Sequence, residues 1–262
     1  MNPEIILSIY AFGLGAFIGS FLNVLIHRLP RKENFVTGRS HCPKCKEMIR
    51  WYDNIPLLSF VILRAKCRRC KAPISWRYPM VELVTASFFL LAFTLYGLSF
   101  HTMVAAIFFS MLLVVTFIDF EYYIIPDRIT YPGMVLGLGL SFVNPLVTPL
   151  DALIGLVAGG ASLYLLAILG DFIFKKESLG GGDIKLAAML GAFLGWKNII
   201  FIFFGAAVLG LIFAIGQMVL SRKQGAGRMI PFGPFLSLAA ILALFFGEVL
   251  IDFYVHDILA LN

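Results

Sequence analysis

The sequence predicts an all-α polytopic membrane protein with about eight transmembrane helices and one long cytoplasmic loop. Of its 262 residues, 60% are hydrophobic and only 14% are charged. A soluble domain cannot bury that much apolar surface, so much of this surface is expected to face lipid. Two further observations support this fold class. The chain contains long apolar runs, as helices that cross a bilayer do, and the basic residues are concentrated in a few segments between these runs.

Eight apolar runs define the expected helices. A long polar segment, 27–78, follows the first run, and the other seven follow with shorter connections. The sixth run is short, so we expect its helix to be tilted, buried in the bundle, or merged with the seventh across Gly195-Trp196-Lys197. By length and apolar content, the helices are expected near 4–26, 80–99, 102–118, 129–146, 152–174, 184–196, 198–220 and 231–252.

Several of these helices carry glycines four residues apart, a spacing that lets helices approach closely in lipid. We find no convincing internal repeat and no low-complexity segment. The glycine pairs are Gly15/Gly19, Gly155/Gly159 and Gly191/Gly195.

The basic residues predict the orientation of the helices. Segment 27–78 holds 13 of the 21 Lys and Arg residues, and with eight helices 20 of the 21 fall on one side, with only Lys197 opposite. Lys and Arg are retained in the cytoplasm, so that side is cytoplasmic and both termini lie outside. The net charge of +6 therefore reflects topology, and we expect no nucleic-acid partner.

The four cysteines of the chain all lie in the cytoplasmic loop. They form two CxxC pairs separated by 21 residues, Cys42/Cys45 and Cys67/Cys70. Two such pairs are typical of a structural, four-thiolate zinc site, which would order a loop that has no core of its own. Four unrelated thiols, a redox dithiol and an iron–sulfur cluster are the alternatives. The fold class is therefore a helical membrane bundle with a cytoplasmic zinc-binding loop.

Two carboxylates at the predicted cytoplasmic edge of the membrane are candidates for chemistry. Asp119 ends the third helix, and Asp183 opens the sixth after Gly180-Gly181-Gly182. Acids at membrane helices are costly and therefore candidate functional groups. Two facing carboxylates in a poorly solvated site share one proton, so that one activates water and the other polarises a peptide carbonyl, as in aspartic proteases. The glycines would permit unusual backbone angles and the close approach of an extended substrate.

A structural role for both acids is an equal alternative on spacing alone. Asp183 would then be an acid favoured by a helix N-terminus, and Asp119 would pair with a base such as Arg128 or Lys185. For Asp127, which follows Pro126, we expect a helix-capping role. We expect Glu121 to be solvated or structural.

An ordered series of motifs resembles the type IV prepilin peptidase family, including its type II secretion members. The resemblance covers nearly the whole chain. Besides the two CxxC pairs and the segment from Asp119 to Asp127, the motifs are Gly19-Ser-Phe-Leu-Asn23-Val-Leu-Ile-His-Arg28-Leu-Pro30, Asn54-Ile-Pro-Leu-Leu-Ser-Phe60, Ile74-Ser-Trp-Arg77-Tyr-Pro79-Met-Val-Glu82-Leu, Gly180-Gly-Gly-Asp183-Ile-Lys185 and Ile230-Pro231-Phe232-Gly233-Pro234.

The resemblance implies an aspartyl endopeptidase of the bacterial inner membrane. It would cut the basic leader of prepilins or pseudopilins after a glycine and then N-methylate the new N-terminal residue with S-adenosylmethionine. It assigns Asp119 and Asp183 as the catalytic pair and the four cysteines as zinc ligands. The active-site loop would consist of Gly180, Gly181, Gly182 and Lys185.

Two departures from the family pattern occur. Ala65 stands where many members have a glycine in a segment linked to methylation, and Glu121 stands where many have a second aspartate. Asn23, Arg28 and Glu82 lie near the cytoplasmic ends of their helices. Buried polar pairing that fixes the bundle is their expected role, and a part in methyl transfer is the alternative.

The basic leader requires acidic contacts, for which Glu121, Asp127 and Glu177 are the candidates, while the basic loop contacts anionic lipid headgroups. We expect a division into 1–99, with the loop at 27–78 and the methyltransferase part, and 100–262, the six-helix peptidase domain. A peptidase without methyl transfer and a membrane transporter or scaffold are the competing hypotheses. Nothing in the sequence defines the oligomeric state or the particular pilin.

Overall fold

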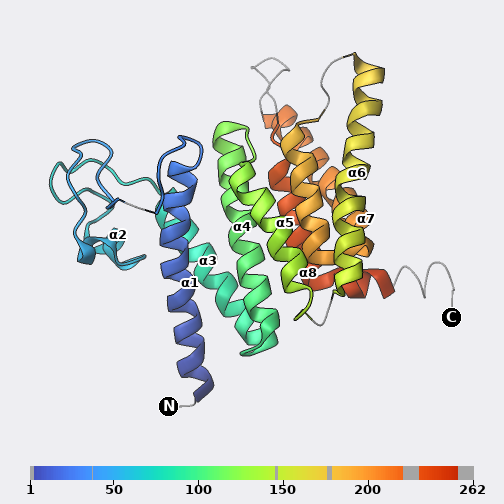
Figure 1. The fold of residues 1–262 in the computed structure, drawn as a ribbon. Coiled ribbons are helices and arrows are strands. Elements are labelled where there is room, and N and C mark those ends of the chain that lie inside the picture. Colours follow the sequence, from blue (N-terminus) through green and yellow to red (C-terminus); the bar gives the residue numbers. More distant parts are fainter. Residues whose placement is uncertain (1–2, 37, 145–146, 176–178, 221–229, 253–262) are drawn as a thin grey trace. The chain divides into compact units, whose positions relative to one another are not determined.

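The computed structural model describes residues 3–36, 38–144, 147–175, 179–220 and 230–252, and over these ranges it confirms the predicted all-α class (Figure 1). Within them the only β-type pairing consists of two isolated bridges in the cysteine loop. The elements are α1 (Pro3–Arg28), the 3-10 helix η1 (Trp51–Asn54), α2 (Leu58–Ile62), α3 (Arg77–Tyr96), α4 (Phe100–Tyr122), α5 (Asp127–Leu140), α6 (Pro149–Phe174), α7 (Gly181–Leu220) and α8 (Gly233–Asp252).

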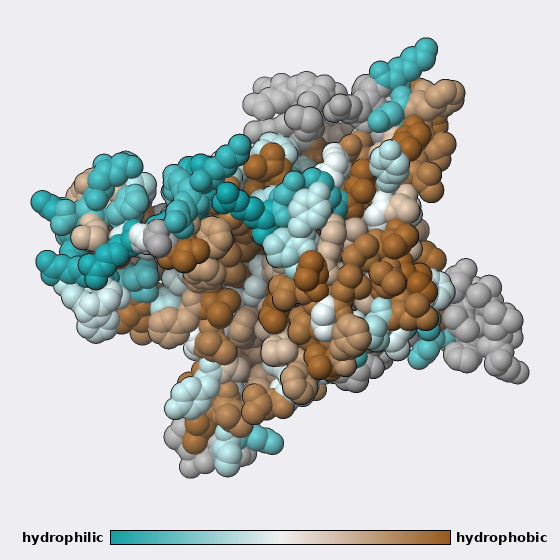
Figure 2. All heavy atoms as spheres, viewed as in Figure 1, coloured by the Kyte–Doolittle hydropathy of each residue, from teal (hydrophilic) through white to brown (hydrophobic). Residues whose placement is uncertain are grey.

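Five helices of the described chain are long and apolar enough to cross a membrane: α1, α3, α4, α6 and α7. A shorter apolar stretch, Gly233–Gly247, lies in α8, and α5 has only 14 residues. The predicted count of eight spans is therefore not confirmed. Figure 2 shows hydrophobic residues spread over the helices and hydrophilic residues gathered over the cysteine loop, as expected for a membrane protein with a polar loop.

Element α7 covers the sixth and seventh predicted helices, which are two helices on either side of a kink at Gly195, so the two are not merged into one continuous helix. The helix is interrupted at Gly195, where φ is 75° and ψ is 169°. Residues that have a side chain rarely adopt these backbone angles, so glycine permits the interruption.

The chain forms two compact units, Met1–Val114 and Val115–Asn262, whose boundary falls inside α4. The predicted functional division between 99 and 100 remains a prediction. In the first unit α1 packs on α3 through glycines. A Cβ on Gly15 would lie 2.7 Å from the Ala86 Cα, and one on Gly19 would lie 2.7 Å from the Glu82 Cα, so only glycine allows this contact.

In the second unit α6 and α7 also meet backbone to backbone. A Cβ on Gly155 would lie 2.3 Å from the carbonyl oxygen of Gly191, and one on Gly159 would lie 2.4 Å from that of Ala187. Helix α6 is set at its start by Thr148, whose hydroxyl accepts the Asp151 N–H at 3.1 Å. The close contact expected from the glycine spacing is thus present, and it aligns the beginning of α7.

We expect Gly191→Ala to destabilise the second unit by about 1–3 kcal/mol, because the added methyl group has no space against α6. Gly216→Ala is the matched control, since it lies in the same helix with no atom within 4 Å of its Cβ position. Thermal unfolding in detergent measures both. Equal midpoints for the two variants would contradict the glycine contact.

Candidate active site and metal centre

Asp119 is a buried carboxylate near the end of α4. Its side chain is 5% exposed, and its Oδ2 accepts the backbone N–H of Gly233 at 3.1 Å. A Cβ on Gly233 would lie 2.7 Å from this same oxygen, so the approach requires glycine at the start of α8. Neither Arg128 nor Lys185, the basic residues considered as structural partners, donates this hydrogen bond to Asp119. The importance of Gly233 was missed, although it lies in the Ile230–Pro234 motif.

Asp183 lies in the first turn of α7, half-buried, where the helix dipole favours an acid. Its Oδ1 is buried and has no hydrogen-bond partner among the described residues. The charges of the Asp183 and Asp119 carboxylates interact, so the two acids are neighbours that can act as a pair. That site therefore combines a carboxylate held by a backbone donor with one that has an open acceptor position.

The glycines before Asp183 do not adopt the unusual angles expected of them. The glycines with positive φ in the described chain are Gly38, Gly97 and Gly195. The close approach does occur at Gly182, where a Cβ would lie 2.9 Å from the Cβ of Ile125, a residue of the same chain. Gly181 has no atom within 4 Å of its Cβ position and begins α7.

Ile125 connects the surroundings of the two acids. Besides its contact with Gly182, its Cδ1 would lie 3.1 Å from a Cβ on Gly233. The Ile125 side chain thus lies between Gly182, at the start of α7, and Gly233, at the start of α8 and next to Asp119. The sequence reading missed this role, because an isoleucine in an apolar protein carries no distinguishing signal.

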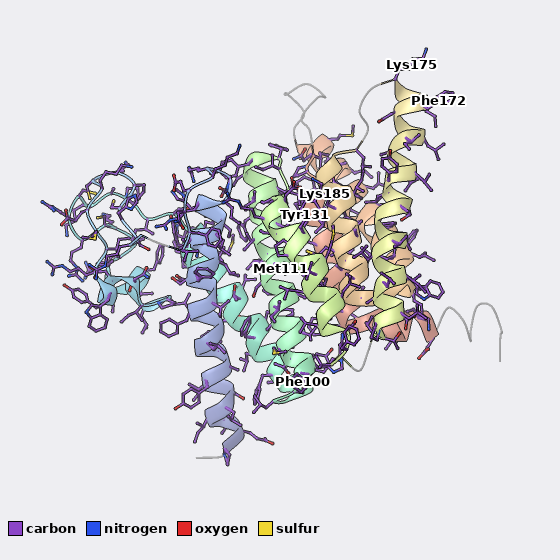
Figure 3. The ribbon with its side chains drawn as sticks, viewed as in Figure 1. Phe100, Met111, Tyr131, Phe172, Lys175 and Lys185 are labelled. Atoms are coloured by element: carbon purple, nitrogen blue, oxygen red, sulfur yellow. The ribbon has the colours of Figure 1, made fainter. Side chains whose placement is uncertain are left out.

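Lys185 contacts Asp127, not either member of the acidic pair. Its Nζ lies 2.7 Å from Asp127 Oδ1 and 5.3 Å from the ring centroid of Tyr131, and Figure 3 shows Lys185 beside Tyr131. The expected capping role of Asp127 is wrong, since the N-cap of α5 is Pro126 and no side chain caps it. The ion pair instead joins the start of α5 to the first turn of α7. Glu121 is exposed.

The four cysteines come together in the loop of the first unit. Their sulfur atoms all lie within 4.8 Å of one another, and the Cys42 and Cys70 sulfurs are 3.8 Å apart. A tetrahedral ion with bonds of about 2.3 Å to thiolates needs sulfurs about 3.8 Å apart. These residues fit a metal ion.

The two CxxC pairs form equivalent knuckles, which corrects the expectation that the chain has no internal repeat. In the first, Cys42 N–H bonds to Glu47 O and Ile49 N–H to Ser40 O; in the second, Cys67 N–H bonds to Ala72 O and Ile74 N–H to Ala65 O. Bridges His41–Met48 and Lys66–Pro73 close the two turns. The shared pattern is C-x-x-C-K-x-x-I, and the lysine of each copy, Lys46 or Lys71, has a positive φ. The repeat is eight residues long, which made it easy to overlook.

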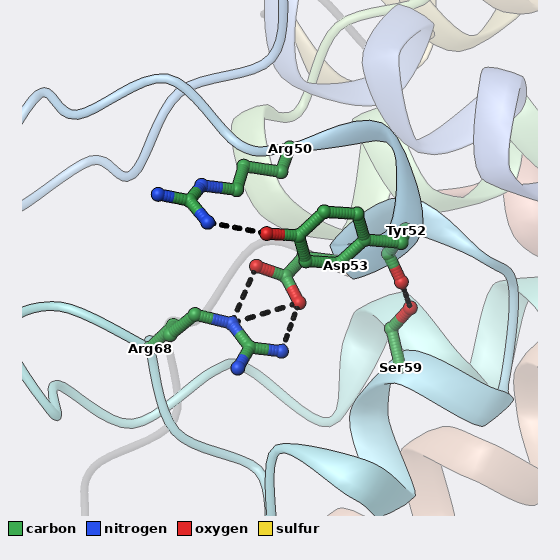
Figure 4. Close-up of polar contacts among 5 residues, drawn as sticks. All are labelled: Arg50, Tyr52, Asp53, Ser59 and Arg68. Atoms are coloured by element: carbon green, nitrogen blue, oxygen red, sulfur yellow. Dashed lines mark hydrogen bonds and ion pairs between the residues drawn. The ribbon is translucent and has the colours of Figure 1, made fainter.

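Ion pairs connect the second knuckle to the rest of the loop. The Arg68 guanidinium binds both carboxylate oxygens of Asp53 in η1, and Arg69 pairs with Glu47 beside the first knuckle (Figure 4 shows the Arg68 contact). The Arg68 guanidinium lowers the pKa of Asp53, so this pair is charged at neutral pH. Figure 4 also shows Ser59 of α2 donating to the carbonyl of Tyr52.

Asn23, Arg28 and Glu82 hold backbone groups of the first unit. Asn23 Nδ2 donates to Tyr78 O at 3.1 Å, and Arg28 donates to the carbonyls of Asn34, Gly38 and Arg39. Glu82 Oε2 accepts the N–H of Leu57 at 2.8 Å, immediately before α2. These contacts agree with the expected structural role, and they place Asn23 and Glu82 where α1 crosses α3.

Comparison with known families matches two models to the chain. Residues 14–96 match the bacterial Peptidase A24 N-terminal domain, and residues 106–215 match the type IV leader peptidase family. The first match includes the cysteine loop, Asn23 and Glu82, and the second includes Asp119 and Asp183. The two parts of the chain thus match separate models.

Curated relatives extend the match to nearly the full chain. A protein named prepilin leader peptidase/N-methyltransferase from Aeromonas salmonicida is 36% identical over 96% of this chain and 94% of its own length. Those of the same name from Neisseria gonorrhoeae and Myxococcus xanthus are 36% and 39% identical over 86% and 83% of this chain. The chain spans 65% of the Myxococcus protein and 86% of the Neisseria one. No solved structure matches.

We expect Arg68→Gln to loosen the cysteine loop, because Asp53 then loses the bidentate partner that fixes the second knuckle against η1. Limited proteolysis of the purified protein should cut the loop faster than in the wild type. Arg64→Gln is the control, since Arg64 is exposed and outside the knuckles. Equal cleavage of the two variants would argue against the cross-link.

Proposed function

Because this chain belongs to the type IV leader peptidase family, we propose that it cleaves the basic leader of type IV prepilins or type II secretion pseudopilins after a glycine. We further propose that it N-methylates the new N-terminal residue. The observation that carries the peptidase proposal is the pairing of buried Asp119 with half-buried Asp183 in one site. The double name of the curated relatives supports both activities over cleavage alone.

The two carboxylates divide the hydrolytic chemistry between them. The N–H of Gly233 stabilises a negative charge on Asp119, so we assign Asp119 as the base that takes a proton from water. The unpartnered Oδ1 of Asp183 suits a protonated carboxyl that donates to the scissile carbonyl oxygen. As Asp119 takes one proton from water, the resulting hydroxide adds to the carbonyl carbon, and Asp183 gives its proton to the carbonyl oxygen to form a gem-diol. Asp119 then gives its proton to the amide nitrogen, the C–N bond breaks to release the new N-terminal amine, and Asp183 recovers a proton from the gem-diol hydroxyl as the leader carboxyl group forms.

The membrane setting explains the position of the cut. We propose that the basic segments lie on the cytoplasmic side of the bacterial inner membrane and that both termini lie outside, because Lys and Arg are retained in the cytoplasm. The basic leader of the substrate remains in the cytoplasm while its apolar helix enters lipid, so the scissile bond lies at this edge. A transporter would instead need ionisable groups near the midplane, and Asp119 and Asp183 lie at helix ends.

The leader requires acidic contacts. Asp127 is bound to Lys185, which reduces its attraction for a basic leader. Exposed Glu121, two residues after Asp119, is therefore the leader contact that we propose. Glu177, the third acid considered, lies outside the described residues. The basic loop is proposed to contact anionic lipid headgroups.

Zinc is the ion that we propose for Cys42, Cys45, Cys67 and Cys70, since four thiolates at tetrahedral spacing form a closed structural site. Zinc bound there orders the loop and takes no part in hydrolysis. We propose residues 1–99 as the methyltransferase part, with S-adenosylmethionine as methyl donor, and 100–262 as the peptidase part. Ala65 departs from the family pattern within the first part and makes methylation the activity to test directly.

Asp119→Asn and Asp183→Asn should each reduce leader cleavage by about 10³-fold or more, because either change removes one of the two proton-transfer roles. Cleavage of a co-expressed prepilin, followed by gel shift, measures the effect. Asp252→Asn is the matched control, an exposed acid at the end of α8 in the same unit. Normal cleavage by either of the first two variants would show the catalytic assignment to be wrong.

Removing the metal should open the cysteine loop, because the thiolates supply its main cross-link. The purified protein is expected to contain one zinc per chain, and Cys67→Ser should lower that content and expose the loop to protease. Zinc affinity should fall as the pH falls, since protons compete for the thiolates. Metal analysis at several pH values tests this; a full complement of zinc in Cys67→Ser would count against the four-thiolate site.

A further inference from the structure

The first unit contains a cavity of about 940 Å³ between the cysteine loop and the crossing of α1 with α3. Cavities of roughly 300–1,000 Å³ hold cofactor-sized ligands. Its lining includes Asn23 of α1 and Glu82 of α3, together with Ile55 and Phe60. Asp119 and Asp183, the acids proposed for leader cleavage, lie in the other unit and are not among the residues that line this cavity.

Asn23 is a lining residue of the cavity and has an acceptor that no donor in the described chain uses. The side chain is 2% exposed, and its Nδ2 donates to the carbonyls of Gly19 and Tyr78, which fixes the orientation of the amide. Its Oδ1 is buried and has no hydrogen-bond partner among the described residues. A buried acceptor without a donor costs about 1–3 kcal/mol, which a bound ligand carrying a donor would recover.

Glu82 supplies a carboxylate one turn along α3 from Tyr78. It is 8% exposed, lines the same cavity, and accepts hydrogen bonds from the N–H of Leu57 and the hydroxyl of Ser20. No cationic side chain pairs with it in the part of the chain that the structure describes. A carboxylate in so little water is expected to have a positive partner. Together with Asn23 Oδ1, it forms a recognition site for a cation that also has hydrogen-bond donors.

Other lining residues, from α2, differ in character. Helix α2 turns Ser59 and Phe60 towards the cavity, while Val61 and Ile62 on its other face are 72% and 71% exposed. Phe60 packs against Trp76, with ring centroids 4.9 Å apart, so the aromatic surface is fixed in place. An apolar aromatic wall suits a flat heterocycle. Basic side chains from the knuckles, Lys44, Lys46 and Arg50, also line the cavity and suit a carboxylate.

We propose that this cavity is the binding site for the methyl donor, S-adenosylmethionine. The ligand has the three required parts: cationic sulfonium and amino groups for Glu82 and Asn23, an adenine ring for the wall at Phe60, and a carboxylate for the basic side chains of the knuckles. The proposal rests on the methyltransferase half of the proposed function and assigns its donor site to the unit matched by the A24 N-terminal model.

Glu82→Gln is the sharpest variant, because the amide oxygen can still accept the Leu57 N–H while the charge is lost. Calorimetric titration of the purified, zinc-loaded protein with S-adenosylmethionine, and separately with S-adenosylhomocysteine, should show binding weakened about tenfold or more. Glu4→Gln, at the far end of α1, removes an acid of the same unit and should bind both ligands as the wild type does. Ile55→Trp should also block binding, by filling the cavity.

Mass spectrometry of pilin matured by each variant distinguishes a failure of the cavity assignment from a failure of the proposed methyltransferase function. We expect Glu82→Gln to yield cleaved pilin with less of the added methyl mass, at unchanged zinc content. Wild-type protein that methylates pilin, with Glu82→Gln and Ile55→Trp both binding the donor normally, would overturn the cavity assignment alone. Wild-type protein that cleaves pilin but binds neither ligand and adds no methyl group would refute the methyltransferase function and the site with it.

Discussion

In a bilayer, an apolar side chain gains little by exchanging lipid for another helix, so these helices associate where their backbones can touch. Glycine makes this contact at Gly19 against Glu82 and at Gly155 against Gly191. The positions of the other groups depend on it. Where α1 and α3 meet, Asn23 reaches the carbonyl of Tyr78, and where α6 and α7 meet, the start of α7 is aligned with Asp183 in its first turn.

The same constraint reaches the acidic pair. Gly233 lies so close to Asp119 that a methyl group would collide with the carboxylate, and Gly182 lies equally close to Ile125. A side chain at either position would push a helix terminus outward and separate the acids. The proposed chemistry therefore requires glycine at positions 182 and 233 as well as the carboxylates of Asp119 and Asp183. The hydrogen bond from the Gly233 N–H to Asp119 is the most direct evidence for this requirement.

Much of this structure could be predicted from the sequence because membrane physics makes strong demands on composition. The apolar runs and the Cys pairs are conspicuous patterns, and both were interpreted correctly as helices and as a cluster of ligands. The partner of Asp119 could not be predicted, because it is a backbone N–H of a residue 114 positions away. Asp127 was misread for a related reason: its partner, Lys185, is distant in sequence, and the local pattern Pro126-Asp127 favours a cap. The knuckle repeat was visible in the letters, yet eight residues are too few to stand out.

The paired knuckles have a consequence for the segment that joins them. Each knuckle supplies two sulfurs to one cluster, so the 21 residues between Cys45 and Cys67 become a closed ring whenever all four are bound to one ion. Closing a ring removes conformational freedom from the disordered chain, much as a covalent staple does. The helix α2 and its preceding turn lie within that ring, so their order is linked to the occupancy of a site that they do not touch. Metal supply to the cell would then set how well one wall of the neighbouring cavity is formed.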